Sequence, residues 1–92
     1  MNETIHVLLT YCDDDDETYC HLFRTKEAVL EYLRDIIRGW YGEECRTPDY
    51  PDWKKDMDKE LAAMEKAMNK KGYWRDGADE TTYVYSEKEF TA

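Results

Sequence analysis

Residues 12–20 read CDDDDETYC, a stretch that gathers the side chains most able to bind a metal ion. Asp13, Asp15 and Glu17 have the spacing of the first three ligands of a calcium-binding loop. Such a loop also needs a glycine at its sixth position and a glutamate at its twelfth, and this sequence has Thr18 and Arg24 there. The pattern therefore does not predict a calcium site.

Zinc would need Cys12 and Cys20 together with His6 and His21. His21 follows Cys20 directly, so on a strand the two side chains point to opposite faces. His6 lies about 20 Å from Cys12 along a strand, and the C-x₂-C spacing of zinc sites is absent. We therefore expect no metal site and no cofactor, with the cysteines acting as small apolar side chains. A Cys12–Cys20 disulfide is allowed by geometry if the two face each other across a hairpin.

The sequence also lacks the patterns of an enzyme. Its one serine, Ser86, lies in a predicted strand, and there is no G-x-S-x-G motif, no glycine-rich phosphate loop and no H-E-x-x-H motif. A Cys20–His6 pair has no third group to orient it, and a chain of 92 residues has little room for a closed pocket. We expect no catalytic residues.

The elements that carry these side chains follow from the pattern of apolar residues. In residues 4–12, Ile5, Val7, Leu9 and Tyr11 alternate with His6, Leu8, Thr10 and Cys12, which predicts a strand with apolar groups on both faces. Residues 18–23, TYCHLF, are a second β-favouring run. The acids between the two runs would repel one another inside a sheet, so a hairpin with an acidic turn is expected.

A helix is predicted from residue 26, with Thr25 as its N-cap and Gly39 or Gly42 as its end. Its apolar face is formed by Val29, Leu33, Ile36, Ile37 and Trp40. Residues 41–51 contain two prolines and a glycine and are expected to form a loop.

A second helix is predicted over residues 53–71, with Asp52 as its cap and Gly72 just past its end. Its apolar stripe consists of Trp53, Met57, Leu61, Met64 and Met68. A turn over residues 76–79 then leads to TTYVYS at 81–86, which is expected to be a third strand that returns to the hairpin.

Together these elements predict one domain over residues 1–92. The order β-β-α-α-β indicates an α+β fold in which a small antiparallel sheet is covered on one face by a helical pair.

The charge of the chain limits its partners. There are 22 acidic and 13 basic residues, a formal charge of −9. This excludes direct binding to nucleic acid or to an anionic membrane, where affinity comes from Lys and Arg, and it favours a basic protein partner. No apolar run reaches the ~20 residues of a membrane span. The N-terminal residues do not resemble a signal peptide, and the cysteine count is odd, so a cytoplasmic protein is expected.

The predicted partner-binding residues are acids that occur in rows or clusters, together with Tyr50. DNA carries a phosphate every ~3.4 Å along each strand, and carboxylates one helical turn apart are separated by about 6 Å, close to two phosphate steps. Such rows suit a groove that normally holds nucleic acid. The predicted site consists of Asp13, Asp14, Asp15, Asp16, Glu17, Glu27, Glu31, Asp35, Glu43, Glu44, Asp49 and Tyr50.

Aromatic residues support a second hypothesis. The chain has eight tyrosines and three tryptophans, residue types that are enriched in protein interfaces. Tyr41, Tyr50, Tyr73, Trp74, Tyr83 and Tyr85 are expected to lie in loops or beside charged positions. The alternative function is therefore a small accessory domain that binds another protein through an aromatic surface, or forms a homodimer through the free edge of the third strand.

The segment EYLRDIIRGWYGEE at residues 31–44, together with the size and acidity of the chain, resembles small acidic phage-encoded anti-CRISPR proteins. Several members of that group imitate DNA to block an effector nuclease. The resemblance implies an inhibitor that acts inside a bacterial host cell on a nucleic-acid-binding nuclease complex. It also implies that residues 13–17 and the acids of residues 43–52 contact lysines and arginines that otherwise hold the target DNA or the guide RNA.

Overall fold

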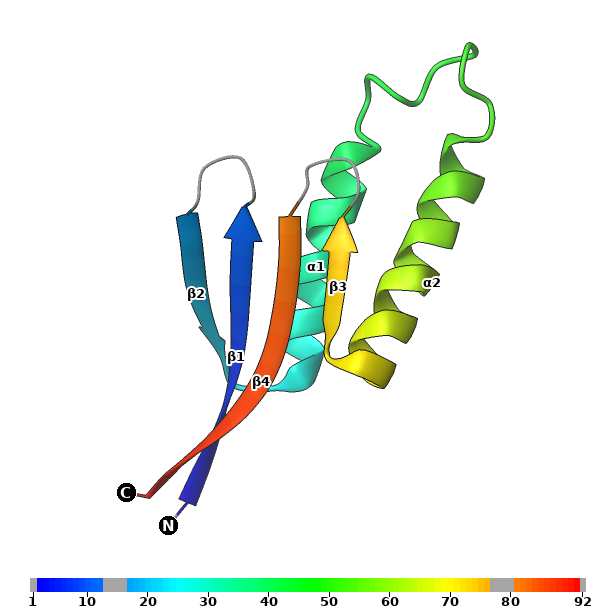
Figure 1. Ribbon diagram of the computed structural model, residues 1–92. Helices are drawn as coiled ribbons and strands as arrows, with labels where there is room; N and C mark the ends of the chain where they lie inside the picture. The colour runs from blue at the N-terminus through cyan, green and yellow to red at the C-terminus, as the bar shows by residue number, and fades with distance from the viewer. Residues whose placement is uncertain (1, 13–16, 77–80, 92) are drawn as a thin grey trace.

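A computed structural model describes residues 2–12, 17–76 and 81–91 of the chain (Figure 1). It contains four strands and two helices in the order β-β-α-α-β-β. The elements are β1 (Asn2–Cys12), β2 (Glu17–Phe23), α1 (Lys26–Trp40), α2 (Trp53–Lys71), β3 (Tyr73–Asp76) and β4 (Thr81–Thr91). The predicted α+β class is confirmed, with one strand more than the sequence pattern indicated.

The four strands form one antiparallel sheet in the order β2-β1-β4-β3. Leu9 lies opposite Cys20 of β2 on one side and opposite Val84 of β4 on the other. The run TTYVYS does return to the hairpin, as predicted. It does not provide a free edge along all of those residues, because the first four residues of β4 pair with β3 and the edge strands of the sheet are β2 and β3. The edge predicted to be free is thus covered at residues 81–84 and not covered by β3 from Tyr85 onward, and the homodimer contact stays a prediction.

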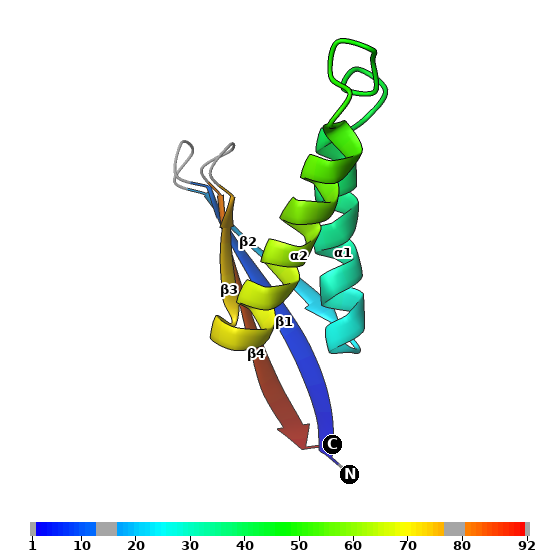
Figure 2. The ribbon, with the colours of Figure 1, turned by 90° about the vertical axis from the view of Figure 1, so that its right-hand side faces the viewer.

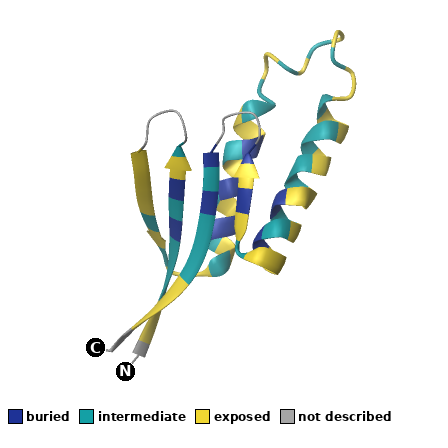
Figure 3. Ribbon diagram, in the orientation of Figure 1, coloured by how far each residue is buried: buried dark blue, intermediate teal, exposed yellow. Residues whose placement is uncertain are grey.

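Both helices pack on the same face of the sheet (Figure 2). The sheet contributes Leu8, Trp74 and Tyr83 to the core between these layers. The helices contribute the side chains predicted from their apolar stripes except Trp53, and the most buried of these are Val29, Leu33, Ile37, Met64 and Met68 (Figure 3). The two layers therefore enclose one core on one side of the sheet.

The helix ends agree with the sequence in part. The Thr25 hydroxyl accepts a hydrogen bond from the Ala28 N–H at 3.0 Å, so the predicted N-cap of α1 is confirmed. Neither predicted glycine ends α1, because Gly39 lies within the helix and the capping residue is Tyr41, with φ −101°. Asp52 occupies the cap position of α2 but makes no side-chain capping hydrogen bond. Gly72 ends α2 with φ 76°, the left-handed conformation expected at that position.

Strands β1 and β4 are longer than their neighbours. β2 stops pairing opposite His6, and β3 stops opposite Val84, whereas β1 and β4 pair with each other from Cys12–Thr81 to Asn2–Thr91. The two long strands therefore leave the body of the domain as a twisted ribbon that carries both termini (Figure 1).

Candidate protein-binding surface

Three short segments account for the negative charge of the chain. Segments 13–17, 43–52 and 76–80 together hold twelve of the 22 acidic residues and one of the 13 basic residues. The rest of the chain therefore has ten acids and twelve bases. The entire net negative charge belongs to these three segments.

The fold brings the described parts of the three segments to one end of the molecule. Cys12 pairs with both Glu17 and Thr81, and Thr81 also pairs with Asp76, so both hairpins reach the same end of the sheet. The loop between α1 and α2 rises at this end as well (Figure 1). We call this region of the surface the acidic end. Its exposed, described acids are Glu17, Glu43, Glu44, Asp49 and Asp52.

The predicted acids of the β1–β2 turn are only partly within the structure. Asp13, Asp14, Asp15 and Asp16 lie outside the described residues. Glu17 is the first residue of β2 and is exposed, and its carboxylate accepts a hydrogen bond from the Tyr19 hydroxyl.

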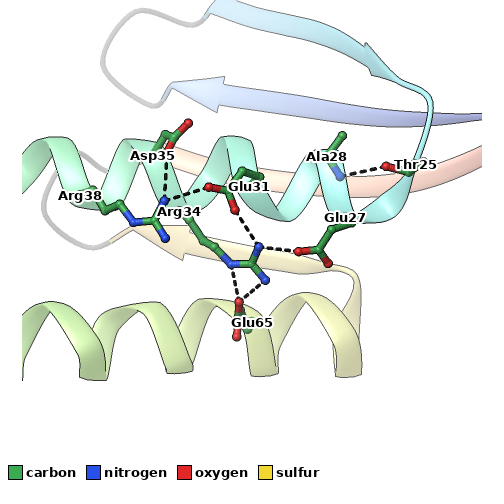
Figure 4. Close-up of polar contacts among 8 residues, drawn as sticks. All are labelled: Thr25, Glu27, Ala28, Glu31, Arg34, Asp35, Arg38 and Glu65. Atoms are coloured by element: carbon green, nitrogen blue, oxygen red, sulfur yellow. Dashed lines mark hydrogen bonds and ion pairs between the residues drawn. The ribbon is translucent and has the colours of Figure 1, made fainter.

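The predicted row of acids on α1, Glu27, Glu31 and Asp35, forms ion pairs with two arginines (Figure 4). Arg34 Nη1 lies 2.6 Å from Glu27 Oε1 and 2.9 Å from Glu31 Oε2. Arg38 Nη1 lies 2.9 Å from Glu31 Oε1 and 3.1 Å from Asp35 Oδ1. Arg34 also donates from Nε to Glu65 on α2 at 2.5 Å. All three predicted carboxylates therefore already accept intramolecular hydrogen bonds.

These contacts shift the ionisation of the groups involved. Hydrogen bonds from Arg38 and then from Arg34 lower the pKa of Glu31 below its usual 4.5. Hydrogen bonds to Glu27 and Glu31, and a further one to Glu65, raise the pKa of Arg34. Glu31 and Arg34 therefore stay charged at neutral pH, and a basic partner would have to compete with two guanidinium groups for the carboxylates of this row.

The loop between the helices is shaped by its own hydrogen bonds. Cys45 N–H donates to Gly42 O at 2.9 Å and Tyr50 N–H donates to Thr47 O at 3.0 Å, which forms two successive turns. Arg46 donates to Tyr41 O at 3.0 Å and places its guanidinium over the Trp53 ring at 4.6 Å. The one basic residue of the loop is thereby bound to the loop itself.

Glu43, Glu44 and Asp49 are exposed on this loop, and none of them forms an ion pair with another described residue. Glu43 and Glu44 also line a shallow open hollow beside Trp40. Two carboxylates next to an indole ring and glycine backbone are groups that attract a lysine or arginine side chain.

Tyr50 is half-buried, and its hydroxyl donates to Asp56 Oδ2 at 2.5 Å. This hydrogen bond, together with desolvation, raises the pKa of Tyr50 to about 12. Tyr50 thus joins the loop to the first turn of α2. It stabilises the loop that carries the predicted acids. Its hydroxyl already donates to Asp56 and is not available to a binding partner.

The predicted aromatic surface is largely internal. Trp74 and Tyr83 are buried and stack on each other, with ring centroids 5.5 Å apart, and Trp40 stacks on Trp74 at 5.8 Å. Tyr85 is half-buried and donates to Glu87 at 2.7 Å. Trp74 and Tyr83 therefore belong to the core, because their strands place them toward the helices. Of the six aromatic residues predicted for this surface, Tyr73 is the one that is strongly exposed.

The cysteines do not come together. Cys12 lies opposite Glu17, whereas Cys20 lies opposite Leu9, so the two do not face each other as a disulfide requires. All three cysteines are free thiols. No group of three or more His, Cys, Asp or Glu side chains within residues 2–12, 17–76 and 81–91 is placed to hold a metal ion.

Comparison of the chain with models of protein families, with curated proteins and with solved structures finds no match. Neither of the two described helices has both the length and the apolar character that crossing a membrane requires.

Proposed function

We propose that this protein is an inhibitor that binds a basic, nucleic-acid-handling protein through its acidic end and competes there with phosphate groups. The observation that supports the proposal is the separation of charge: three segments supply the whole net negative charge, and their described residues lie at one end of the molecule. Carboxylates gathered on one end raise the negative potential there well above that of an evenly charged surface.

Two features of the acidic end suit this role. Glu43, Glu44 and Asp49 are exposed and form no ion pair with another described residue, so no intramolecular bond has to be broken when a lysine or arginine arrives. The turns of the loop and the Tyr50–Asp56 hydrogen bond hold it in shape before binding, which lowers the ordering cost of association. The carboxylates of the α1 row are also held in place, but they already bond to Arg34 and Arg38, so these bonds would have to be broken.

The resemblance to anti-CRISPR proteins supplies the class of partner in this proposal, which is an RNA-guided DNA nuclease inside a bacterial cell. The carboxylates would occupy lysines and arginines that otherwise bind the phosphates of target DNA or guide RNA. Binding would then be fast and would weaken as salt rises.

The test measures DNA cleavage by a purified, guide-loaded nuclease of this class, with this protein added at increasing concentration. Glu43→Gln/Glu44→Gln should raise the inhibitory concentration about tenfold, since each exposed ion pair is worth up to ~1 kcal/mol. Changing Asp13 to Asp16 to asparagine should abolish inhibition. Glu3→Gln/Glu89→Gln is the matched control, because it removes the same charge from exposed residues at the opposite end of the β1–β4 pair.

Circular dichroism should show the same fold in all variants. Inhibition that survives both acidic-end variants, or that does not weaken between 0.05 and 0.5 M salt, would remove the acidic end from the interface.

A further inference from the structure

We infer that the uncovered face of the sheet binds the same face of a second copy of this protein. Both helices lie on one side of the sheet, and no described element covers the other side (Figure 2). Residues paired across antiparallel strands share a face, so the pairing of the strands identifies the side chains on each side.

The uncovered face has an apolar centre, with the hydroxyl side chains of Thr18, Thr82 and Ser86 beside it. β1 contributes Val7, Leu9 and Tyr11 to it, because the alternating residues Leu8 and Thr10 are buried toward the helices. Leu22 lies beside Val7, Val84 lies beside Leu9, and Tyr73 lies beside Val84. Leu22 is 65% exposed, Tyr73 48% and Tyr11 39%. An antiparallel sheet with one solvated face normally shows polar residues there, and this face departs from that pattern.

The charged side chains of the described strands on this face lie near its two ends. Arg75 lies opposite Thr82 near one end of the face, and Lys88 lies opposite Ile5 near the other. No charged side chain of the described strands lies on the face between them. The partner of this face must therefore be flat, apolar and uncharged, unlike the basic partner that the acidic end attracts.

The area is sufficient for a dimer. Three strands over about seven residues and β3 over its four residues, at ~3.4 Å per residue and ~4.8 Å between strands, give a flat footprint of roughly 400 Å² per copy. Two such faces bury about 800 Å² as flat area, and more once the uneven surface of the side chains is counted. This lies near the ~1,000 Å² that a specific interface requires.

A second copy satisfies each requirement by symmetry. Its face has the same flatness and the same twist, and two such sheets pack aligned at about 30°. A two-fold axis across the strands puts the two acidic ends at opposite ends of the dimer, whereas an axis along the strands would put them side by side. Because each copy carries a charge of −9, repulsion selects the first arrangement. The product is a four-layer assembly with helices outside and sheets inside.

Light scattering on a sizing column tests the inference. The wild-type protein should have about twice the 11.1 kDa mass of one chain. Leu9→Lys/Val84→Lys should raise the dimer dissociation constant at least about 100-fold, because lysine ammonium groups would be desolvated in the interface. Ala62→Lys/Ala63→Lys is the matched control, since both alanines are exposed on α2, and it should stay dimeric.

Leu22→Lys provides a second variant that cannot disturb the core, because Leu22 is already largely exposed. It should also weaken the dimer by at least tenfold. A wild-type protein that is monomeric at 0.5 mM, or a dimer unaffected by both face variants, would overturn the inference. Raising salt should strengthen this dimer between two like-charged chains, the opposite of its effect on the proposed inhibitor complex, so each can fail without the other.

Cysteine cross-linking tests the orientation. Cys20 lies on the uncovered face, beside Leu9, near the middle of β2. In a Cys12→Ser/Cys45→Ser variant, an axis across the strands places the two Cys20 thiols over each other, within reach of a short bismaleimide. An axis along the strands would instead place the two Cys20 thiols at opposite edges of the two stacked sheets. Efficient cross-linking supports the proposed orientation, and its absence in a proven dimer would overturn it.

Discussion

Arg34 links the two helices through charge. It contacts Glu27 and Glu31 on its own helix and Glu65 on α2, and its side chain is 18% exposed. Arg34→Gln should lower the free energy of unfolding by about 1 kcal/mol, because three carboxylates lose a shared cation and the helices lose their ion pair. Urea denaturation measures this, and Arg38→Gln is the control. Arg38 is 46% exposed and bonds within α1 alone, so its loss should cost less.

The same network sets a pH dependence. Because the two arginines lower the pKa of Glu31 in the folded state, its contribution to stability is fully present above the usual value of 4.5. That contribution is lost as pH falls through the lowered value and Glu31 becomes protonated. The difference in stability between the wild-type protein and Glu31→Gln should therefore be constant near neutral pH and shrink below about pH 4.5. A difference that stays constant down to pH 2 would contradict the role assigned to Arg38 and Arg34.

At the scale of elements, two glycines in helical contexts should respond in opposite directions to the same change. Gly72 ends α2 with φ 76°, a conformation that alanine adopts only with strain, so Gly72→Ala should destabilise the fold by about 1 kcal/mol. Gly39 lies within α1 with open space where a Cβ would stand. Gly39→Ala should stabilise the protein by roughly 0.5–1 kcal/mol. Thermal denaturation of both variants provides the test, and equal signs would refute the assigned geometry.

The elements in which apolar residues recur with a clear helical or strand spacing were predictable from the sequence. The helices follow from stripes such as Val29–Leu33–Ile37, and the β1–β2 hairpin follows from alternation on each side of an acidic run. β3 was missed because four residues directly after a helix give no measurable alternation, although Trp74 and Asp76 are buried and Tyr73 and Arg75 exposed. That omission also made β4 look like an edge strand.

The candidate site was predictable only in part, for a similar reason. Sequence locates the acids but not their neighbours, so the α1 row looked available when each of its carboxylates already bonds to Arg34 or Arg38. The uncovered face did leave a signal, since β1 is apolar on both faces. One helical layer can cover only one of them, and the second face then needs another partner.

For the whole molecule, the concentration of acids at one end should weaken the fold at low salt. Carboxylates on the acidic end repel one another within a Debye length, which is ~30 Å at 0.01 M salt and ~8 Å at 0.15 M. Screening should therefore raise the melting temperature by ~2–4 °C, since 0.5 kcal/mol corresponds to that shift in a domain of this size. The measurement uses Leu22→Lys as the background at low protein concentration, so that formation of the weakened dimer contributes little.

In that background, Glu43→Gln/Glu44→Gln should raise the melting temperature at low salt and have little effect at high salt, because it removes charge from the crowded end. Glu3→Gln/Glu89→Gln removes the same charge from the opposite end, where Lys88 is adjacent to Glu89, and should give a smaller rise or a fall. Equal responses of the two pairs would mean that the repulsion is spread over the whole surface. The charge separation that carries the proposed function would then have no measurable energetic consequence.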